Sequence, residues 1–145
     1  MEKKIVPARI EDAVLVKNID DVSFEEIFHE KLEYYEQCFE NGYDIYLLMV
    51  EGIAAGEVIL RKDDDYTIGI ESIAIVPSFQ KMGLSKYLLD FVDSYSNNYK
   101  KIILEVYVHN KKAIDIYLKK GYSYAEVVKN FYAEGYDSFI MEKTL

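Results

Sequence analysis

Apolar residues of this chain follow two patterns: short continuous or alternating runs, and longer segments in which they recur every three or four positions. The first pattern is typical of β-strands, and Gly, Asn and Asp residues that favour turns interrupt it. It predicts seven strands, at residues 3–9, 43–50, 56–61, 67–76, 102–108, 122–132 and 136–145.

The second pattern predicts four helices, at residues 10–19, 24–40, 84–95 and 110–120. Ser23 and Glu26 have the spacing of a capping box, in which each residue satisfies a free backbone N–H of the other, so we expect the longer second helix to follow it. Asn41 and Gly42 end that helix, and Gly121 ends the last one.

The order of these elements predicts an α+β fold with a mixed sheet. Strand 67–76, helix 84–95 and strand 102–108 form a strand–helix–strand unit, whose two strands run parallel. No repeat, low-complexity tract or linker divides the chain. We therefore expect residues 1–145 to form one domain, with about seven strands in a central sheet and four flanking helices.

Composition narrows the classes of function. The 145 residues include 26 acidic and 17 basic side chains, a formal charge of −9, which disfavours nucleic acid as a partner because binding it needs clustered Lys and Arg. A single cysteine, Cys38, excludes an internal disulfide, and no Cys and His group has metal-ligand spacing. The N-terminus lacks a signal-peptide core and no apolar stretch spans a bilayer, so we expect a cytoplasmic protein without a membrane partner.

The turn between strand 67–76 and helix 84–95 is free of acidic residues. Free N–H groups at a helix N-terminus hold phosphate oxygens, and a small-residue loop lets the ligand approach them. Gly83 allows that approach, Ser85 is small and adds a hydroxyl, and Lys81 adds a cation. The turn has neither GxxxxGK[ST] nor GxGxxG, which disfavours an ATP or dinucleotide site.

The segment "IAIVPSFQKMGLSKYLL" resembles the acyl-CoA-binding motif of the GNAT acetyltransferase superfamily, [RQ]xxGx[GA] between a strand and a helix. Gln80, Gly83 and Ser85 occupy its positions, and Ser85 departs from the usual Gly or Ala. A second segment, "LEVYVHNKKAIDIYLKKGY", is similar to the superfamily's strand, Asn and AxxxYxxxGF pattern. Its matching residues are Asn110, Ala113, Tyr117, Gly121 and Tyr122.

The resemblance implies a GNAT fold in which the two parallel strands splay around acyl-CoA, with acetyl-CoA as donor, CoA as product and no metal. Pantetheine would pair with the backbone of one strand, and the diphosphate would lie on the turn. The cofactor-binding residues implied are Ile73, Ala74, Ile75, Gln80, Lys81, Met82, Gly83, Leu84, Ser85, Lys86, Asn110, Ala113 and Tyr117.

Acetyl transfer by direct attack needs a neutral amine and a proton for the departing thiolate. By resemblance, Tyr117 is the general acid. Glu105 and Glu71 are carboxylates within otherwise apolar strands, where burial raises a pKa toward the working range, so both are candidates for the base. Glu105 is the first choice because its "LEVY" context resembles "LEVR" of RimI-like ribosomal-protein N-terminal acetyltransferases.

The C-terminal segment also resembles the RimI-like ending, in which a tyrosine-bearing hairpin borders the peptide substrate. Tyr132, Asp137 and Met141 agree with that ending, whereas Phe131 and Tyr107 replace a tyrosine and an arginine. Tyr107, Phe131 and Tyr132 are therefore the expected substrate-binding residues.

The acceptor that these residues favour is a primary amine, first of all a protein or peptide N-terminus. An α-amine has a pKa about 2.5 units below that of lysine, so its free base costs about 3.5 kcal/mol less to present at neutral pH. A small amine, such as a polyamine, an aminoglycoside-like compound or an amino acid, is the alternative, and a non-catalytic acyl-CoA-binding module is the alternative of another class. The protein is expected to be a monomer or a homodimer.

Overall fold

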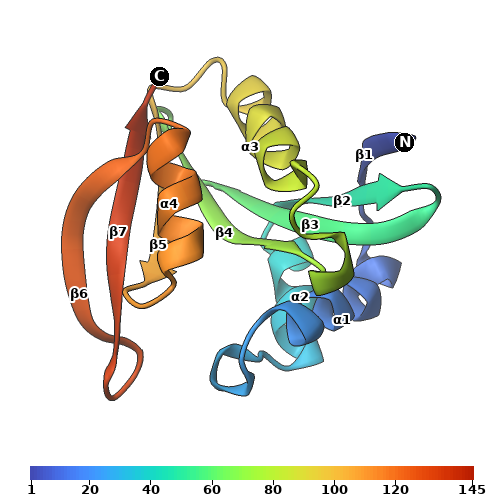
Figure 1. Cartoon of the computed structure of the whole chain (residues 1–145), viewed down its shortest axis with the longest axis horizontal. Coiled ribbons are helices and arrows are strands. Elements are labelled where there is room, and N and C mark those ends of the chain that lie inside the picture. Colours follow the sequence, from blue (N-terminus) through green and yellow to red (C-terminus); the bar gives the residue numbers. More distant parts are fainter.

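The computed structural model describes all residues, Met1–Leu145, as one sheet flanked by four helices (Figure 1). The strands are β1 (Lys3–Pro7), β2 (Asp44–Val50), β3 (Ile53–Lys62), β4 (Thr67–Ile75), β5 (Lys101–Tyr107), β6 (Ser123–Ala133) and β7 (Tyr136–Thr144). The helices are α1 (Ala13–Ser23), α2 (Leu32–Glu40), α3 (Leu84–Tyr95) and α4 (Lys111–Lys119). Short 3-10 turns lie at Ile10–Asp12, Glu26–Phe28 and Pro77–Phe79.

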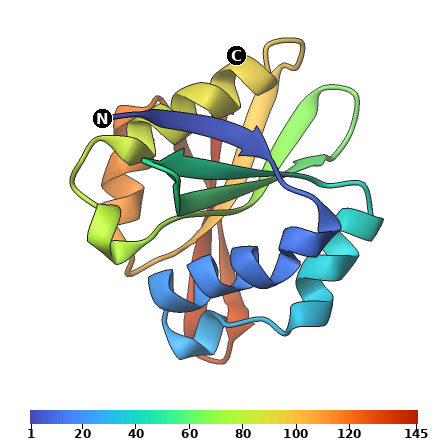
Figure 2. The same ribbon diagram turned by 90° about the vertical axis from the view of Figure 1, so that its right-hand side faces the viewer.

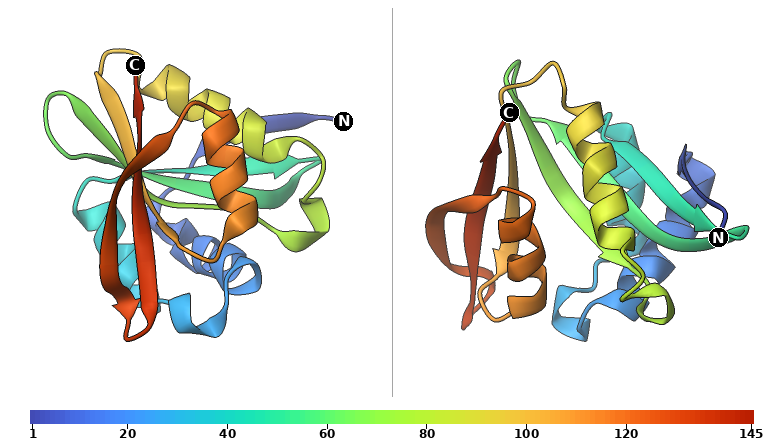
Figure 3. Two further views of the ribbon diagram at one scale, coloured as in Figure 1. Left: turned by 60° about the vertical axis from the view of Figure 1, so that its left-hand side comes forward. Right: turned by 45° about the horizontal axis from the view of Figure 1, so that its top comes forward.

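The sheet has the strand order β1-β2-β3-β4-β5-β7-β6, and all neighbours are antiparallel except β4 and β5. These two parallel strands pair only over Thr67–Ile70 and Lys101–Leu104. Beyond Ile70 and Leu104 they diverge, and the sheet opens into a V (Figure 3). The mixed α+β sheet predicted from the sequence, with its parallel pair splayed, is confirmed.

Helices cover both faces of the sheet (Figure 2). The apolar stripes of α3 and α4 pack on one face in a core of 19 buried residues, which includes Leu88, Ile102 and Leu104. Helices α1 and α2 pack on the other face in a smaller core, which includes Val16 and Tyr35. Each helix thus buries its apolar stripe against the sheet and leaves its polar side to solvent.

The expected helix over residues 24–40 is wrong in its first half. Helix α1 runs on to Ser23, whose hydroxyl donates to the Ile19 carbonyl (2.6 Å), and no capping box forms. Phe24 is extended (φ −116°, ψ 156°), and α2 begins only at Leu32. Residues 24–28 instead form an extended segment and a 3-10 turn that cross to the other arm of the V, where Phe28 packs on Tyr107 and Tyr132.

The hairpin between β2 and β3 is tighter than expected. Residues 53–55 belong to β3, and the turn is only Glu51 and Gly52, both with positive φ (49° and 77°). Such a pair fits the right-handed twist of the flanking strands.

The four helices are too short or too polar for any of them to span a lipid bilayer.

Candidate functional site

A groove of about 520 Å³ lies between the free part of β4, the start of α3 and one side of α4. Nearly all residues expected to bind the cofactor line it, whereas Met82 does not and is 49% exposed. The lining members of that set are Ile73, Ala74, Ile75, Gln80, Lys81, Gly83, Leu84, Ser85, Lys86, Asn110, Ala113 and Tyr117.

The turn at the mouth of this groove is built to receive an anion. Gly83 is the N-cap of α3 in the left-handed region (φ 74°), and no side chain caps the free N–H groups that follow it. A Cβ on Gly83 would meet no atom within 4 Å, so the space over the turn is open. Because free amides, a positive helix end and the lysines Lys81 and Lys86 meet here, the groove fits a CoA diphosphate.

Two polar side chains brace the groove from within. Gln80 donates from Nε2 to the Ile75 carbonyl (3.0 Å) and accepts from Lys112 Nζ (3.1 Å), so it ties the turn to β4 and α4. Asn110 caps α4 by accepting from the Ala113 amide (3.2 Å). Gln80 therefore links the two halves of the V, and Asn110 fixes the start of α4 beside the groove.

Replacing Ser85 by Asp tests the anion site. The second residue of a helix favours an acidic side chain, so the variant should keep or raise the thermal stability of the fold. The same charge would repel a diphosphate, and we expect the Kd of CoA to rise by about tenfold or more. Calorimetric titration of S85D against S85A, which removes only the hydroxyl, measures this. Unchanged CoA affinity in S85D would contradict this placement of the diphosphate.

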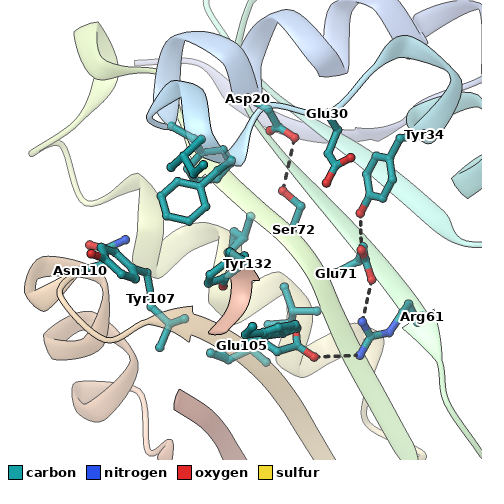
Figure 4. A pocket seen from close by; sticks show the side chains of 18 of the residues that line it. Asp20, Glu30, Tyr34, Arg61, Glu71, Ser72, Glu105, Tyr107, Asn110 and Tyr132 are labelled. Carbon is teal, nitrogen blue, oxygen red and sulfur yellow. Dashed lines mark hydrogen bonds and ion pairs between the residues drawn. The ribbon is translucent and has the colours of Figure 1, made fainter. Parts of the chain in front are cut away.

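A second cavity, of about 380 Å³, lies on the α1 and α2 side of the V (Figure 4). It is called the acceptor cavity below. Glu71, Glu105, Tyr107, Phe131 and Tyr132, which the sequence indicates as base and substrate residues, all line it. Residues that sequence reasoning missed also line it: Asp20, Phe24, Ile27, Phe28, Glu30, Tyr34, Tyr35, Arg61 and Ser72.

A β-bulge in β4 explains why two successive residues serve this cavity. Leu60 pairs with Ile70 and Ile59 pairs with Ser72, so Glu71 is the extra residue between them. The bulge breaks the normal alternation of faces. Glu71 and Ser72 consequently both face α1 and α2, where Glu71 accepts from the hydroxyl of Tyr34 and Ser72 reaches Asp20.

Arg61 joins the two candidate bases across the opening of the V. Its Nη1 donates to Glu71 Oε1 (2.6 Å), and its Nη2 lies 3.8 Å from Glu105 Oε1 (Figure 4). The guanidinium lies over Gly69, where a Cβ would come within 2.3 Å of Nη2. A glycine inside an apolar strand indicates that another group approaches the backbone closely. Gly69 therefore signals a close contact at this position, which the structure identifies as Arg61.

The two carboxylates have different surroundings. Glu71 is held by both Tyr34 and the close contact to Arg61. Glu105 has only the longer contact to Arg61, and burial raises its pKa above the usual range while Arg61 opposes that rise. Glu105 therefore has the looser coordination of the two, and its burial favours the proton uptake that a general base needs.

Tyr117 lies where the two cavities meet. It belongs to the lining of both, together with Phe24, Ile73 and Asn110. Burial raises the pKa of Tyr117 above its ordinary value, so the hydroxyl keeps its proton throughout the physiological range. Its position and its protonation state are those of a proton donor at the junction.

Aromatic rings close one end of the acceptor cavity. Phe28, from the turn between α1 and α2, packs edge-on against Tyr132 of β6 (4.9 Å between centroids) and in a tilted arrangement against Tyr107 of β5 (5.5 Å). Phe131 stacks on Tyr132 (4.9 Å). The sequence predicted Tyr107, Phe131 and Tyr132. It placed Phe28 in the first half of the helix expected over residues 24–40, where no α-helix forms.

Comparisons with known proteins find relatives of this chain in sequence and in fold. Residues 14–122 match the model of the Acetyltransferase (GNAT) family. An N-alpha-acetyltransferase of Sulfurisphaera tokodaii is 26% identical over 165 residues, covering 99% of this chain and 94% of the relative. The crystal structure of the ribosomal-protein-S18-alanine N-acetyltransferase from Escherichia coli superposes with a TM-score of 0.88, at 22% identity, 99% coverage of this chain and 94% of that one. A GNAT acetyltransferase of Elizabethkingia anophelis with acetyl-CoA bound has a TM-score of 0.78, at 21% identity, covering 99% of this chain and 98% of that one.

Proposed function

Because this chain belongs to the GNAT family of acetyltransferases, we propose that it moves the acetyl group of acetyl-CoA to the α-amine of a protein or peptide N-terminus. The observation that carries the proposal is the junction at Tyr117, where a groove with an anion-binding turn meets a cavity with carboxylates. Curated relatives that are N-alpha-acetyltransferases support the choice of acceptor.

Each proposed step belongs to a residue of this chain. Bound acetyl-CoA supplies a thioester carbonyl for the amine to attack and leaves as the thiol. Glu105 takes a proton from the amine, directly or through one water, which gives the neutral nucleophile. As the carbon–sulfur bond breaks, the Tyr117 hydroxyl gives its proton to the departing sulfur. The attacking nitrogen then loses its second proton, which restores the Tyr117 hydroxyl, and Glu105 releases the first proton to solvent. Glu105 of β5 and Tyr117 of α4 both line the acceptor cavity.

Glu71 is proposed as a positioning residue. Its carboxylate is already engaged by the Tyr34 hydroxyl and by Arg61 Nη1, so proton uptake there would break two hydrogen bonds to the charged form. The Glu71 carboxylate binds the Arg61 guanidinium and so holds it 3.8 Å from Glu105. This assignment favours Glu105 among the two candidates that the sequence left open.

Arg61 should set the pH at which the enzyme becomes active. Its positive charge stabilises the Glu105 carboxylate, so Arg61→Met raises the pKa of Glu105 further and keeps the base protonated to a higher pH. We expect the acidic limb of the kcat/KM profile to move to higher pH. Lys62→Met, at the neighbouring exposed residue, is the matched control and should leave that limb in place. A superimposable profile in R61M would exclude this role of Arg61.

A small polyamine is a second candidate acceptor, favoured by one observation. Four carboxylates line the acceptor cavity, those of Asp20, Glu30, Glu71 and Glu105, against the single cation of Arg61. Such a cavity attracts cations. Acetyl-CoA turnover with free N-terminal peptides, with α-N-formylated peptides and with spermidine separates the two. We expect turnover only with peptides that have a free N-terminus. Turnover with spermidine and with no peptide would instead identify a polyamine acetyltransferase.

A further inference from the structure

A cluster of four polar side chains lies against the inner wall of the acceptor cavity. Asp20 of α1, Tyr35 of α2 and Ser72 of β4 line the cavity, and Glu57 of β3 lies behind them. Asp20 is 4% exposed and Glu57 is fully buried. The proposed acid and base chemistry uses none of these groups.

Hydrogen bonds hold the cluster together on one side of Asp20. The Tyr35 hydroxyl donates to Asp20 Oδ2 (2.7 Å). The Ser72 hydroxyl lies 3.4 Å from Asp20 Oδ2 (Figure 4). It lies closer, at 2.8 Å, to Glu57 Oε1. Asp20 Oδ1 receives no hydrogen bond from a hydroxyl, amide or ammonium group.

One proton is shared between the two acids. Burial raises the pKa of Glu57 well above its usual range and also raises that of Asp20, on which the hydrogen bonds from Glu57, Tyr35 and Ser72 act in the opposite direction. Glu57 therefore carries the proton and donates it toward Asp20, which keeps its charge. The Ser72 hydroxyl has one proton and lies nearer Glu57, so the two donors to Asp20 are Tyr35 and Glu57. A carboxylate accepts about four hydrogen bonds, so Asp20 has spare capacity.

The charge of Asp20 has no counter-ion in the protein. Glu71 and Glu105, in the same cavity, both contact Arg61, whereas the charged groups that act on Asp20 are the acids Glu57 and Asp21. Burying a carboxylate without a cation or a full set of donors is unfavourable. A ligand whose hydrogen-bond donor reaches Asp20 offsets this unfavourable burial. A ligand with an apolar group at the same position does not.

We propose that Asp20 is a specificity-determining residue, which selects acceptors that carry a hydrogen-bond donor, a hydroxyl or an ammonium, beside the reacting amine. The inference rests on the proposed transfer to N-terminal amines. In that setting the donor is the side chain of the first residue of the peptide. Thr or Ser supplies a hydroxyl, and Lys supplies an ammonium.

Isosteric peptides test this selection directly. Peptides that differ only in having Thr or Val as first residue have the same shape at that position, and we expect kcat/KM to favour Thr by about tenfold or more. A second pair, Lys and norleucine, separates the ammonium from the hydroxyl as the preferred donor. The assay is acetyl-CoA turnover with each peptide at equal concentration.

Variants locate the selection at Asp20. Asp20→Asn removes the charge, so the preference for Thr over Val should fall toward one, with acetyl-CoA binding and thermal stability as readouts of the fold. Glu57→Gln is the matched variant. Its side-chain amide still donates to Asp20, and the preference should persist. If D20N does not fold, the wild-type rate ratios of the two peptide pairs, Thr to Val and Lys to norleucine, decide.

The outcomes are distinguishable. Equal rates within both peptide pairs, Thr with Val and Lys with norleucine, overturn the role of Asp20 while the proposed function stands. An unchanged preference in folded D20N does the same. A folded protein that binds acetyl-CoA and acetylates no peptide overturns the proposed function and this selection with it.

Discussion

Replacing Tyr117 by Phe should lower kcat by about 10²- to 10⁴-fold, the usual contribution of a positioned proton donor. The side chain is buried at the junction of the groove and the acceptor cavity, so Phe fills the same space and removes only the hydroxyl. The departing thiolate then has no acid beside it. Stopped-flow or steady-state thiol release with acetyl-CoA and a free N-terminal peptide measures the change.

The affinity for CoA separates this role from a structural one. Tyr117 contributes its ring to the groove lining, and Phe retains that ring, so the Kd of CoA in Y117F should stay within about threefold of wild type, because a ring retained preserves apolar contact. Tyr122→Phe is the matched control, since that neighbouring hydroxyl is buried in the core without a partner. A wild-type kcat in Y117F would remove Tyr117 from the mechanism.

The second large effect is expected at Glu105. Glu105→Gln should reduce kcat/KM by about 10²- to 10⁴-fold, because the amide has the same shape but takes up no proton. The pH profile gives an independent test. Burial raises the pKa of Glu105, and activity needs the deprotonated form, so wild-type activity rises as pH increases through that pKa. The E105Q variant should lack this limb.

Glu71→Gln provides the contrast. It weakens the hold on Arg61 but leaves the proposed base in place, so we expect a loss of less than about tenfold, in line with the loss of one supporting hydrogen bond. A large loss of kcat/KM in E71Q with a small one in E105Q would reverse the assignment of the two carboxylates.

The sequence predicted well what local patterns determine. Strand and helix periodicity placed the central sheet, and the turn at Gly83 lies at the mouth of a groove lined by nearly all of the expected cofactor residues. The acceptor side was predicted less completely. Glu105 and Tyr107 line the cavity as expected, because β5 is regular and alternation puts both residues on one face. Tyr132 lines it too, although the pairing of β6 with β7 shifts register between Val128 and Ala133.

Apart from Arg61, whose close approach Gly69 indicates, the missed residues reach the site through tertiary contacts without a sequence signature. Tyr34 and Asp20 sit on helices whose spacing marks only a buried face, and the bulge that turns Glu71 and Ser72 toward them is visible only in the pairing of β3 with β4. Phe28 was not predicted as a site residue for a related reason. Its apolar periodicity favours a helix, but packing against Tyr132 stabilises a turn instead.

The most direct measurement of the central claim is mass spectrometry of a peptide with one free α-amine and one lysine, incubated with the protein and acetyl-CoA. The account predicts a single acetyl group on the α-amine, formed in proportion to released CoA, and no reaction when that amine is formylated. Binding of acetyl-CoA by the folded protein without any acetylation of the α-amine would contradict it.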